Sequence, residues 1–221
     1  RIELKENPDY VSTIIGPRRA GKTYRCYQHI HDLHDDGIPE ENVLYINFED
    51  ERLLNADAND LEAIRDAYYA IANVDKDKPV WFFFDEIQQV EDWPAWVRRV
   101  NDHEDERLVI TGSSAKLLSK DLATALRGRT LTTEVYPLSF AEYLDWHGVD
   151  YDASRLPESD ARHDIQKRFE DYLRRGGYPD TVKYEGQRDT LLQEYYDTMI
   201  FRDVIERYNI RHPKKLRTLA K

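Results

Sequence analysis

The sequence lacks a second cysteine, a long apolar run and an excess of basic residues, and each absence excludes a class of protein. Cys26 is the only cysteine among 221 residues, so no disulfide can form within the chain. No stretch approaches the roughly 20 consecutive apolar residues that a membrane-spanning helix needs. The first residues, Arg1 to Lys5, contain no apolar signal core. We therefore expect a soluble, cytoplasmic protein with no membrane partner.

Basic residues are scarce relative to acidic ones. The chain has 32 Lys and Arg against 43 Asp and Glu, which gives a formal net charge of -11 at pH 7. An acidic surface repels a polyanion, so the composition argues against a protein that coats nucleic acid broadly. A local basic patch is compatible with these numbers, and nucleic acid therefore stays an open alternative as a partner.

One segment has the pattern of a phosphate-binding loop. Residues 16–23 read Gly-Pro-Arg-Arg-Ala-Gly-Lys-Thr and fit G-x-x-x-x-G-K-[ST]. They follow an apolar run at 10–15 that is typical of a buried strand, and helix-forming residues 24–35 come next. In this arrangement, loop N–H groups and the helix N-terminus converge on phosphate oxygens. The pattern predicts that the chain binds a nucleoside triphosphate.

The residues of this loop have separate predicted roles. Lys22 reaches the β- and γ-phosphates, and Thr23 supplies a hydroxyl group to Mg²⁺. The backbone does the binding around Arg18 and Arg19, whose side chains can face solvent. The predicted nucleotide-binding residues are Gly16, Pro17, Arg18, Arg19, Ala20, Gly21, Lys22, Thr23 and Tyr24.

Segments typical of strands and helices alternate over the first 136 residues. The expected strands are residues 10–15, 43–48, 80–84, 108–111 and 131–136. Residues 58–73 and 94–100 read as helices between them. Such alternation predicts a parallel α/β sheet.

The pattern changes near residue 137. From residue 139 onward the segments are helical, at 140–146, 162–175 and 187–208, with a break at Gly176 to Pro179. We therefore expect an α/β core of residues 1–137 and a smaller helical part of residues 138–221.

A second motif supplies carboxylates. Residues 80–84 are five large apolar residues, and Asp85 and Glu86 follow directly. A buried central strand that ends in acids delivers them to the carboxyl edge of the sheet, which is the arrangement of a Walker B motif. Asp85 is predicted to hold Mg²⁺, and Glu86 to orient and deprotonate the attacking water.

Two further pairs of residues are candidates for the same site. Ser113 and Ser114 follow the strand at 108–111 and are predicted to lie between the attacking water and the γ-phosphate. Arg127 and Arg129 precede the last strand, and we expect them near the edge of the sheet where nucleotide binds. One of them is a candidate arginine finger, in cis or in trans. The ordinary alternatives are helix caps and turns for the serines and solvated surface positions for the arginines.

Taken in order, these motifs resemble those of archaeal and bacterial AAA-type P-loop ATPases. The resemblance rests on segments 16–23, 45–50, 84–88, 111–118, 126–129, 137–144, 176–179 and 201–208. It implies an additional-strand P-loop NTPase whose parallel sheet has the order 5-1-4-3-2, followed by a smaller α-helical lid, with ATP and Mg²⁺ as ligands. Longer relatives continue into a C-terminal region, and the helix-like end of this chain at 213–221 leads us to expect a fragment of such a protein.

The leading hypothesis is Mg²⁺-dependent ATP hydrolysis that couples nucleotide state to rearrangement of the helical half or of a partner. A nucleotide-gated switch or interaction module with little turnover is one alternative. A DNA-associated ATPase is another. Residue chemistry does not distinguish ATP from GTP, and the resemblance favours ATP. A partner protein or self-assembly is compatible with the motifs, and an arginine that acts in trans requires an assembly.

Overall fold

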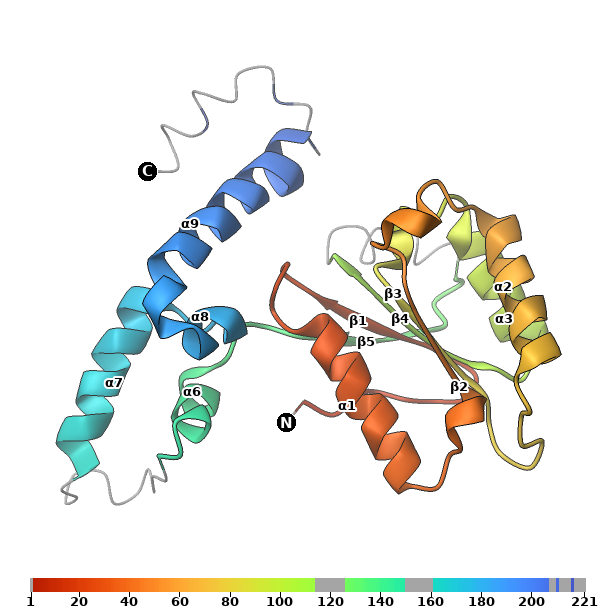
Figure 1. The fold of residues 1–221 in the computed structure, drawn as a ribbon, viewed down its shortest axis with the longest axis horizontal. Helices are drawn as coiled ribbons and strands as arrows, with labels where there is room; N and C mark the ends of the chain where they lie inside the picture. Colours follow the sequence, from red (N-terminus) through yellow and green to blue (C-terminus); the bar gives the residue numbers. More distant parts are fainter. Residues whose placement is uncertain (1, 114–125, 150–160, 207–209, 211–215, 217–221) are drawn as a thin grey trace. The chain divides into compact units, whose positions relative to one another are not determined.

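Five parallel strands form the sheet of the computed structural model, which describes residues 2–113, 126–149, 161–206, 210 and 216 (Figure 1). The strands are β1 (Val11–Gly16), β2 (Val43–Asn47), β3 (Trp81–Asp85), β4 (Arg107–Ser113) and β5 (Thr130–Glu134). Their order is β2-β3-β4-β1-β5, and every neighbouring pair is parallel. Read from the other edge, this is the order 5-1-4-3-2, so the predicted fold class is confirmed.

The chain divides into two compact units. One consists of Arg1–Pro17 and Gly21–Tyr136, and the other of Arg18–Ala20 and Pro137–Lys221. The helices of the first unit are α1 (Lys22–Asp35), α2 (Ala58–Ile71) and α3 (Trp93–His103), with short 3-10 helices η1 (Glu40–Asn42), η2 (Glu51–Leu53) and η3 (Ile87–Gln89). Helix α2 begins at a capping box in which Asp57 and Asp60 satisfy each other's backbone N–H groups.

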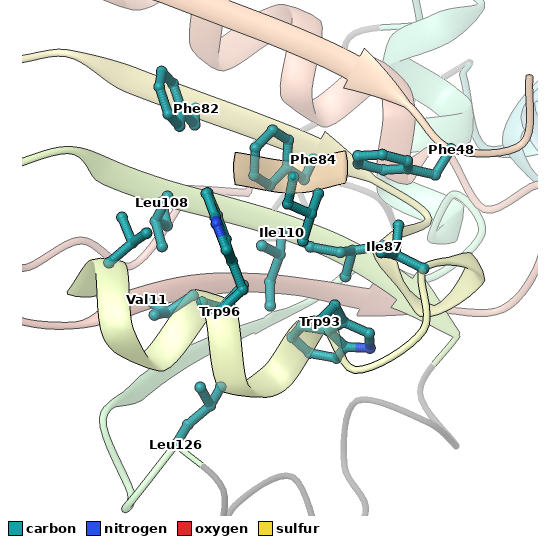
Figure 2. Packing of buried hydrophobic residues seen from close by; sticks show 14 of the residues in the cluster. Val11, Phe48, Phe82, Phe84, Ile87, Trp93, Trp96, Leu108, Ile110 and Leu126 are labelled. Carbon is teal, nitrogen blue, oxygen red and sulfur yellow. The ribbon is translucent and has the colours of Figure 1, made fainter. Parts of the chain in front are cut away.

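Helices cover both faces of the sheet because β3 is apolar on both sides. The ring of Phe84 lies 5.7 Å from that of Trp96, on the face covered by α2 and α3 (Figure 2). On the other face, His29 of α1 lies 5.7 Å from the ring of Phe83. Successive side chains of a strand point to opposite faces. A continuous apolar run therefore marks a strand that is covered twice, as the sequence predicted for β3.

The second unit is helical, as expected, but its segmentation differs from the prediction. Its elements are α6 (Phe140–Trp146), α7 (Ala161–Arg175), α8 (Pro179–Lys183), η5 (Glu185–Gln187), α9 (Arg188–Thr198) and a π-helix, η6 (Met199–Glu206). Helix α8 was not predicted; it begins at Pro179, the last residue of the predicted break, because proline suits the first helical position, at which a missing N–H group costs nothing. Among the helices that the structure describes, none combines the length and hydropathy that a bilayer crossing requires.

The core on the α2 and α3 face makes a testable prediction. Phe82 is 0% exposed, so Phe82→Ala should leave a cavity and lower the free energy of unfolding by about 3–5 kcal/mol. Ile71, at the end of α2, is 85% exposed, and Ile71→Ala should change the same quantity by less than about 0.5 kcal/mol. Urea unfolding of both variants measures the difference, and equal losses would contradict this packing.

Candidate functional site

The carboxyl ends of three strands meet at one edge of the sheet. β1 ends at Gly16, which pairs with Ser113 at the end of β4, and the neighbouring β3 ends at Asp85. This arrangement brings Thr23 and Asp85, 62 positions apart in the sequence, within hydrogen-bonding distance. Ligands of open α/β sheets bind at this edge. The phosphate-binding loop and the two predicted acids therefore form one site.

Each of the two loop glycines is required for a different reason. A Cβ atom on Gly16 would lie 2.1 Å from the carbonyl oxygen of Val135, because the chain leaving β5 runs directly beside it. Gly21 has open space around it but a φ of 104°, the left-handed conformation that lets the loop turn into α1. Arg19, inside the loop, has a φ of 61°. Gly16 thus permits a close approach of two chain segments, and Gly21 permits a turn.

Lys22 lies inside the loop and is only 5% exposed. Its Nζ atom is 3.4 Å from the carbonyl oxygen of Gly16 and 3.3 Å from that of Pro17. It is also 3.2 Å from Oε1 of Glu86. The predicted phosphate-binding cation and the predicted general base are therefore in direct contact.

Asp85 is fully buried, and hydroxyl groups surround its carboxylate. Thr23 of α1 donates to Oδ2 at 2.6 Å, and the phenol of Tyr45 on β2 donates to the same oxygen at 2.9 Å. Thr111 of β4 donates to Oδ1. Burial, together with the hydrogen bond to Tyr27 and the nearby Asp85, raises the pKa of Tyr45 far above its usual range, so this phenol keeps the proton that it donates.

Glu86 has a strained backbone that its surroundings hold in place. Its φ of 55° is in the left-handed region, which is uncommon for a residue other than glycine. Its N–H group donates to the hydroxyl of Thr111 at 3.0 Å, and its Oε2 atom accepts from the amide of Gln88. Gln88 and Lys22 thus hold the side chain of Glu86 beside the loop, and Thr111 holds its backbone.

Sequence reasoning missed Tyr45 and Thr111. Thr111 carried a signal, since a polar residue near the carboxyl end of a strand adjacent to β3 is placed to meet Asp85. Tyr45 had none of this kind, because an aromatic residue within a strand pattern is ordinarily a packing residue. Its role became visible only through the pairing of β2 with β3, in which Asn47 is paired with Asp85 and Tyr45 lies two residues earlier.

Of the two predicted serines, the structure describes Ser113. Ser113 is the last residue of β4, and its backbone pairs with Gly16 at the start of the loop. Ser114 lies outside the described residues. The backbone of Ser113 therefore lies beside the start of the loop, and its place between the attacking water and the γ-phosphate stays a prediction.

The expected position of Arg127 and Arg129 is wrong. β5 is parallel to β1, and the carbonyl group of Arg129 accepts a hydrogen bond from the N–H group of Val11, the first residue of β1. Residues that precede a parallel strand lie at the amino edge of the sheet, opposite the phosphate-binding loop. Arg129 pairs there with Asp102 near the end of α3, and Arg127 is exposed. Neither guanidinium group can serve the nucleotide site of its own chain from this position.

The oxygen atoms around Asp85 fit a magnesium ion. Asp85 supplies a buried carboxylate and Thr23 a hydroxyl oxygen 2.6 Å from it, and Mg²⁺ prefers such hard oxygen donors. Proteins commonly hold Mg²⁺ through one or two carboxylates together with the phosphates of a substrate. Thr23 follows the phosphate-binding loop directly, so the residues present suit this mode of binding.

Two family models match this chain, and two curated relatives are longer than it. The model of a family described as an AAA domain matches residues 8–144, and that of a domain of unknown function (DUF8612) matches residues 166–221. An uncharacterised protein of Methanocaldococcus jannaschii is 38% identical over 99% of this chain and 47% of its own length. An uncharacterised protein of Haemophilus influenzae is 33% identical over 99% of this chain and 52% of its own. This chain thus spans about half the length of these curated relatives.

Solved structures similar to this chain include Cdc6p from Pyrobaculum aerophilum and Hsp104 of S. cerevisiae in a complex with casein. The first has a TM-score of 0.43 at 14% identity, over 61% of this chain and 41% of that one. The second has a TM-score of 0.45 at 15% identity, over 87% of this chain and 35% of that one.

The loop glycines allow a graded test of this geometry. Gly21→Ala should lower the free energy of unfolding by about 1–2 kcal/mol, the cost of a left-handed L-residue. Gly16→Ala should cost more, because β1 and the chain at Val135 must separate to admit the methyl group. Gly186→Ala is the control, since that position is open and its φ is not left-handed, and it should change stability by less than about 0.5 kcal/mol. Urea unfolding gives all three values, and equal effects of Gly16→Ala and Gly186→Ala would exclude the close approach.

Proposed function

Because the chain belongs to the family of AAA domains, we propose that it binds ATP with Mg²⁺ at the carboxyl edge of the sheet and hydrolyses the bond between the β- and γ-phosphates. One observation carries the proposal, the meeting of Lys22, Asp85 and Glu86 at this edge. A cation for the phosphates, a carboxylate for the metal and a base for the water are the parts that phosphoryl transfer requires of a protein.

Binding of the phosphates falls to the loop and to Lys22. The N–H groups of the loop and of the first turn of α1 face the anion, and the ammonium group exchanges its contacts with two loop carbonyls for charge-assisted contacts with phosphate oxygens. Thr23 and Asp85 would hold Mg²⁺, which when bound neutralises the charge that develops on those oxygens. The family favours ATP over GTP as the nucleotide.

Glu86 supplies the base. Its carboxylate accepts a proton from the attacking water, the water oxygen forms the new bond to the γ-phosphorus, and the bridging oxygen leaves with ADP and keeps the electron pair of the broken bond. The hydrogen bond from the Glu86 N–H group to Thr111 holds the backbone, and the bond from the Gln88 amide to Oε2 holds the carboxylate before the reaction. This preorganisation offsets the strained backbone at Glu86.

The two compact units suggest what the nucleotide controls. We propose an ATPase core of residues 1–137 and a helical lid of residues 138–221, in which nucleotide state rearranges the helical part or a bound partner. The two compact units, which separate close to this boundary, support the division. The curated relatives are about twice as long as this chain, and we propose a partner or a second copy of the chain as the receiver of the rearrangement.

A nucleotide-gated switch with little turnover is the second candidate, and one observation favours it. Lys22 and Glu86 form a buried ion pair in which the base is already occupied by a cation. If this pair persists after ATP binds, the carboxylate stays engaged with Lys22 in place of the attacking water and hydrolysis is slow. The two candidates differ in turnover and agree in binding.

Glu86→Gln separates binding from chemistry. Glutamine keeps the size of the side chain and removes the base, so ATP binding should stay within a few-fold of wild type while phosphate release falls by about 10²- to 10⁴-fold. Calorimetric titration with ATP and Mg²⁺ and a phosphate-release assay measure the two quantities. Lys22→Ala should lose binding, and Glu40→Gln, an exposed change in η1, should alter neither.

Loss of ATP binding in Glu86→Gln would overturn the role of Glu86 as the base. Tight binding without turnover in the wild type would favour the switch. A wild type that binds no ATP with Mg²⁺ would overturn both candidates.

The position of Arg127 and Arg129 makes a further prediction about assembly. If one of them completes the site of a neighbouring copy, Arg127→Ala or Arg129→Ala lowers turnover and an equimolar mixture with Glu86→Gln regains part of it, because one subunit supplies the base and the other the arginine. Phosphate release from each protein alone and from the mixture tests this. Arg174→Ala, an exposed change on α7, should leave turnover unchanged. No recovery in the mixture would exclude an arginine in trans.

A further inference from the structure

We propose that Tyr45 is a positioning residue that sets the Mg²⁺ affinity of the site by fixing the carboxylate of Asp85 through its phenol hydroxyl. The inference rests on the proposed function, since it concerns the carboxylate that holds the metal there. It adds to that function a residue on the edge strand β2, which carries none of the predicted nucleotide-binding or catalytic residues.

The pairing of β2 with β3 explains why Tyr45 reaches Asp85. Tyr45 is paired with Phe83, and Asn47 is paired with Asp85. Since alternate residues of a strand share a face, Tyr45 and Asp85 lie on the same face, offset by two positions. A phenol is long enough to span this offset, and its hydroxyl group lies 2.9 Å from Oδ2.

The hydrogen bonds that the Tyr45 hydroxyl makes indicate that it orients Asp85 and is not itself a metal ligand. A hydroxyl group has one proton to donate and two lone pairs. Thr23 gives its proton to Asp85 at 2.6 Å, so its oxygen keeps lone pairs that can face a cation. Tyr45 gives its proton to the same oxygen of Asp85 and accepts from the hydroxyl of Tyr27 at 3.3 Å. Its phenol is engaged within the protein, and we therefore infer that it orients the metal-binding carboxylate without joining it as a ligand.

The ring and the hydroxyl of Tyr45 have separable contributions. The ring packs against that of Tyr27 with centroids 5.1 Å apart, and this contact survives when only the oxygen is removed. The hydroxyl is one of two donors to Oδ2, so its loss leaves the carboxylate attached through Thr23 on that side and Thr111 on the other. Tyr45→Phe therefore loosens Asp85 without removing it or opening a cavity.

Residues that orient a metal ligand typically contribute about 10- to 100-fold to metal affinity. We test Tyr45→Phe in the full chain by calorimetric titration with ATP at Mg²⁺ concentrations that rise from zero in EDTA. The Mg²⁺ concentration that gives half-maximal enhancement of ATP binding should increase about tenfold. ATP binding in EDTA should stay unchanged, since the loop and Lys22 are intact.

Tyr68→Phe is the matched control. It removes another phenol hydroxyl, which donates to the backbone carbonyl of Glu41. Tyr68 belongs to α2 and packs on Phe82, on the face of the sheet opposite to α1. It should leave the Mg²⁺ dependence unchanged. A shift as large as that of Tyr45→Phe would mean that the loss of any packed phenol hydroxyl produces the effect, and would overturn the inference.

A double-mutant cycle distinguishes positioning from a structural effect. If Tyr45 acts through Asp85, Tyr45→Phe has no further effect on the Mg²⁺ dependence in an Asp85→Asn background. An equal shift in both backgrounds would contradict the role. An unchanged Mg²⁺ dependence in Tyr45→Phe alone would overturn it while the proposed function stands. A wild type without Mg²⁺-dependent ATP binding would overturn the proposed function itself.

Discussion

Burial of the carboxylate of Asp85 is the constraint on which the site depends, because a carboxylate removed from water is stable only when protein donors replace the water. The donors are hydroxyl groups from three elements, Thr23 of α1, Tyr45 of β2 and Thr111 of β4. A shift of β2 or of β4 by one residue along its neighbour would turn its donor, Tyr45 or Thr111, to the opposite face of the sheet. The hydrogen bonds to Asp85 therefore form only when the strands of the sheet are paired in this register.

Most strands and helices could be predicted from the local pattern of apolar residues. The order of the strands and helix α8 could not be predicted from spacing or composition. The continuous apolar run before Asp85 identified a central strand because both of its faces are covered. The order of the strands came from the family resemblance, since contacts between β1 and β4 join segments that are remote in sequence. Helix α8 was missed because proline breaks a helix from within but is also favoured at its first position, where Pro179 stands.

The candidate site could be predicted where its residues are contiguous. Lys22 and Thr23 share one loop, and Asp85 and Glu86 share one strand end, so local motifs suffice to identify them. Thr111 and Tyr45 join them through strand pairing, which a sequence does not display. The arginines were misplaced for a related reason: their distance along the chain from β5 was apparent, but the direction of β5 relative to β1 decides which edge they occupy.

The left-handed backbone of Glu86 sets the stability of the fold against the proposed catalytic role of its side chain. Glycine and asparagine adopt a φ near 55° more easily than glutamate does, so either would relax the chain at this position. Neither carries a carboxylate, and neither would pair with Lys22. A more stable chain would carry glycine or asparagine at position 86, and the proposed role as the base is a reason for glutamate to stand there despite the strain.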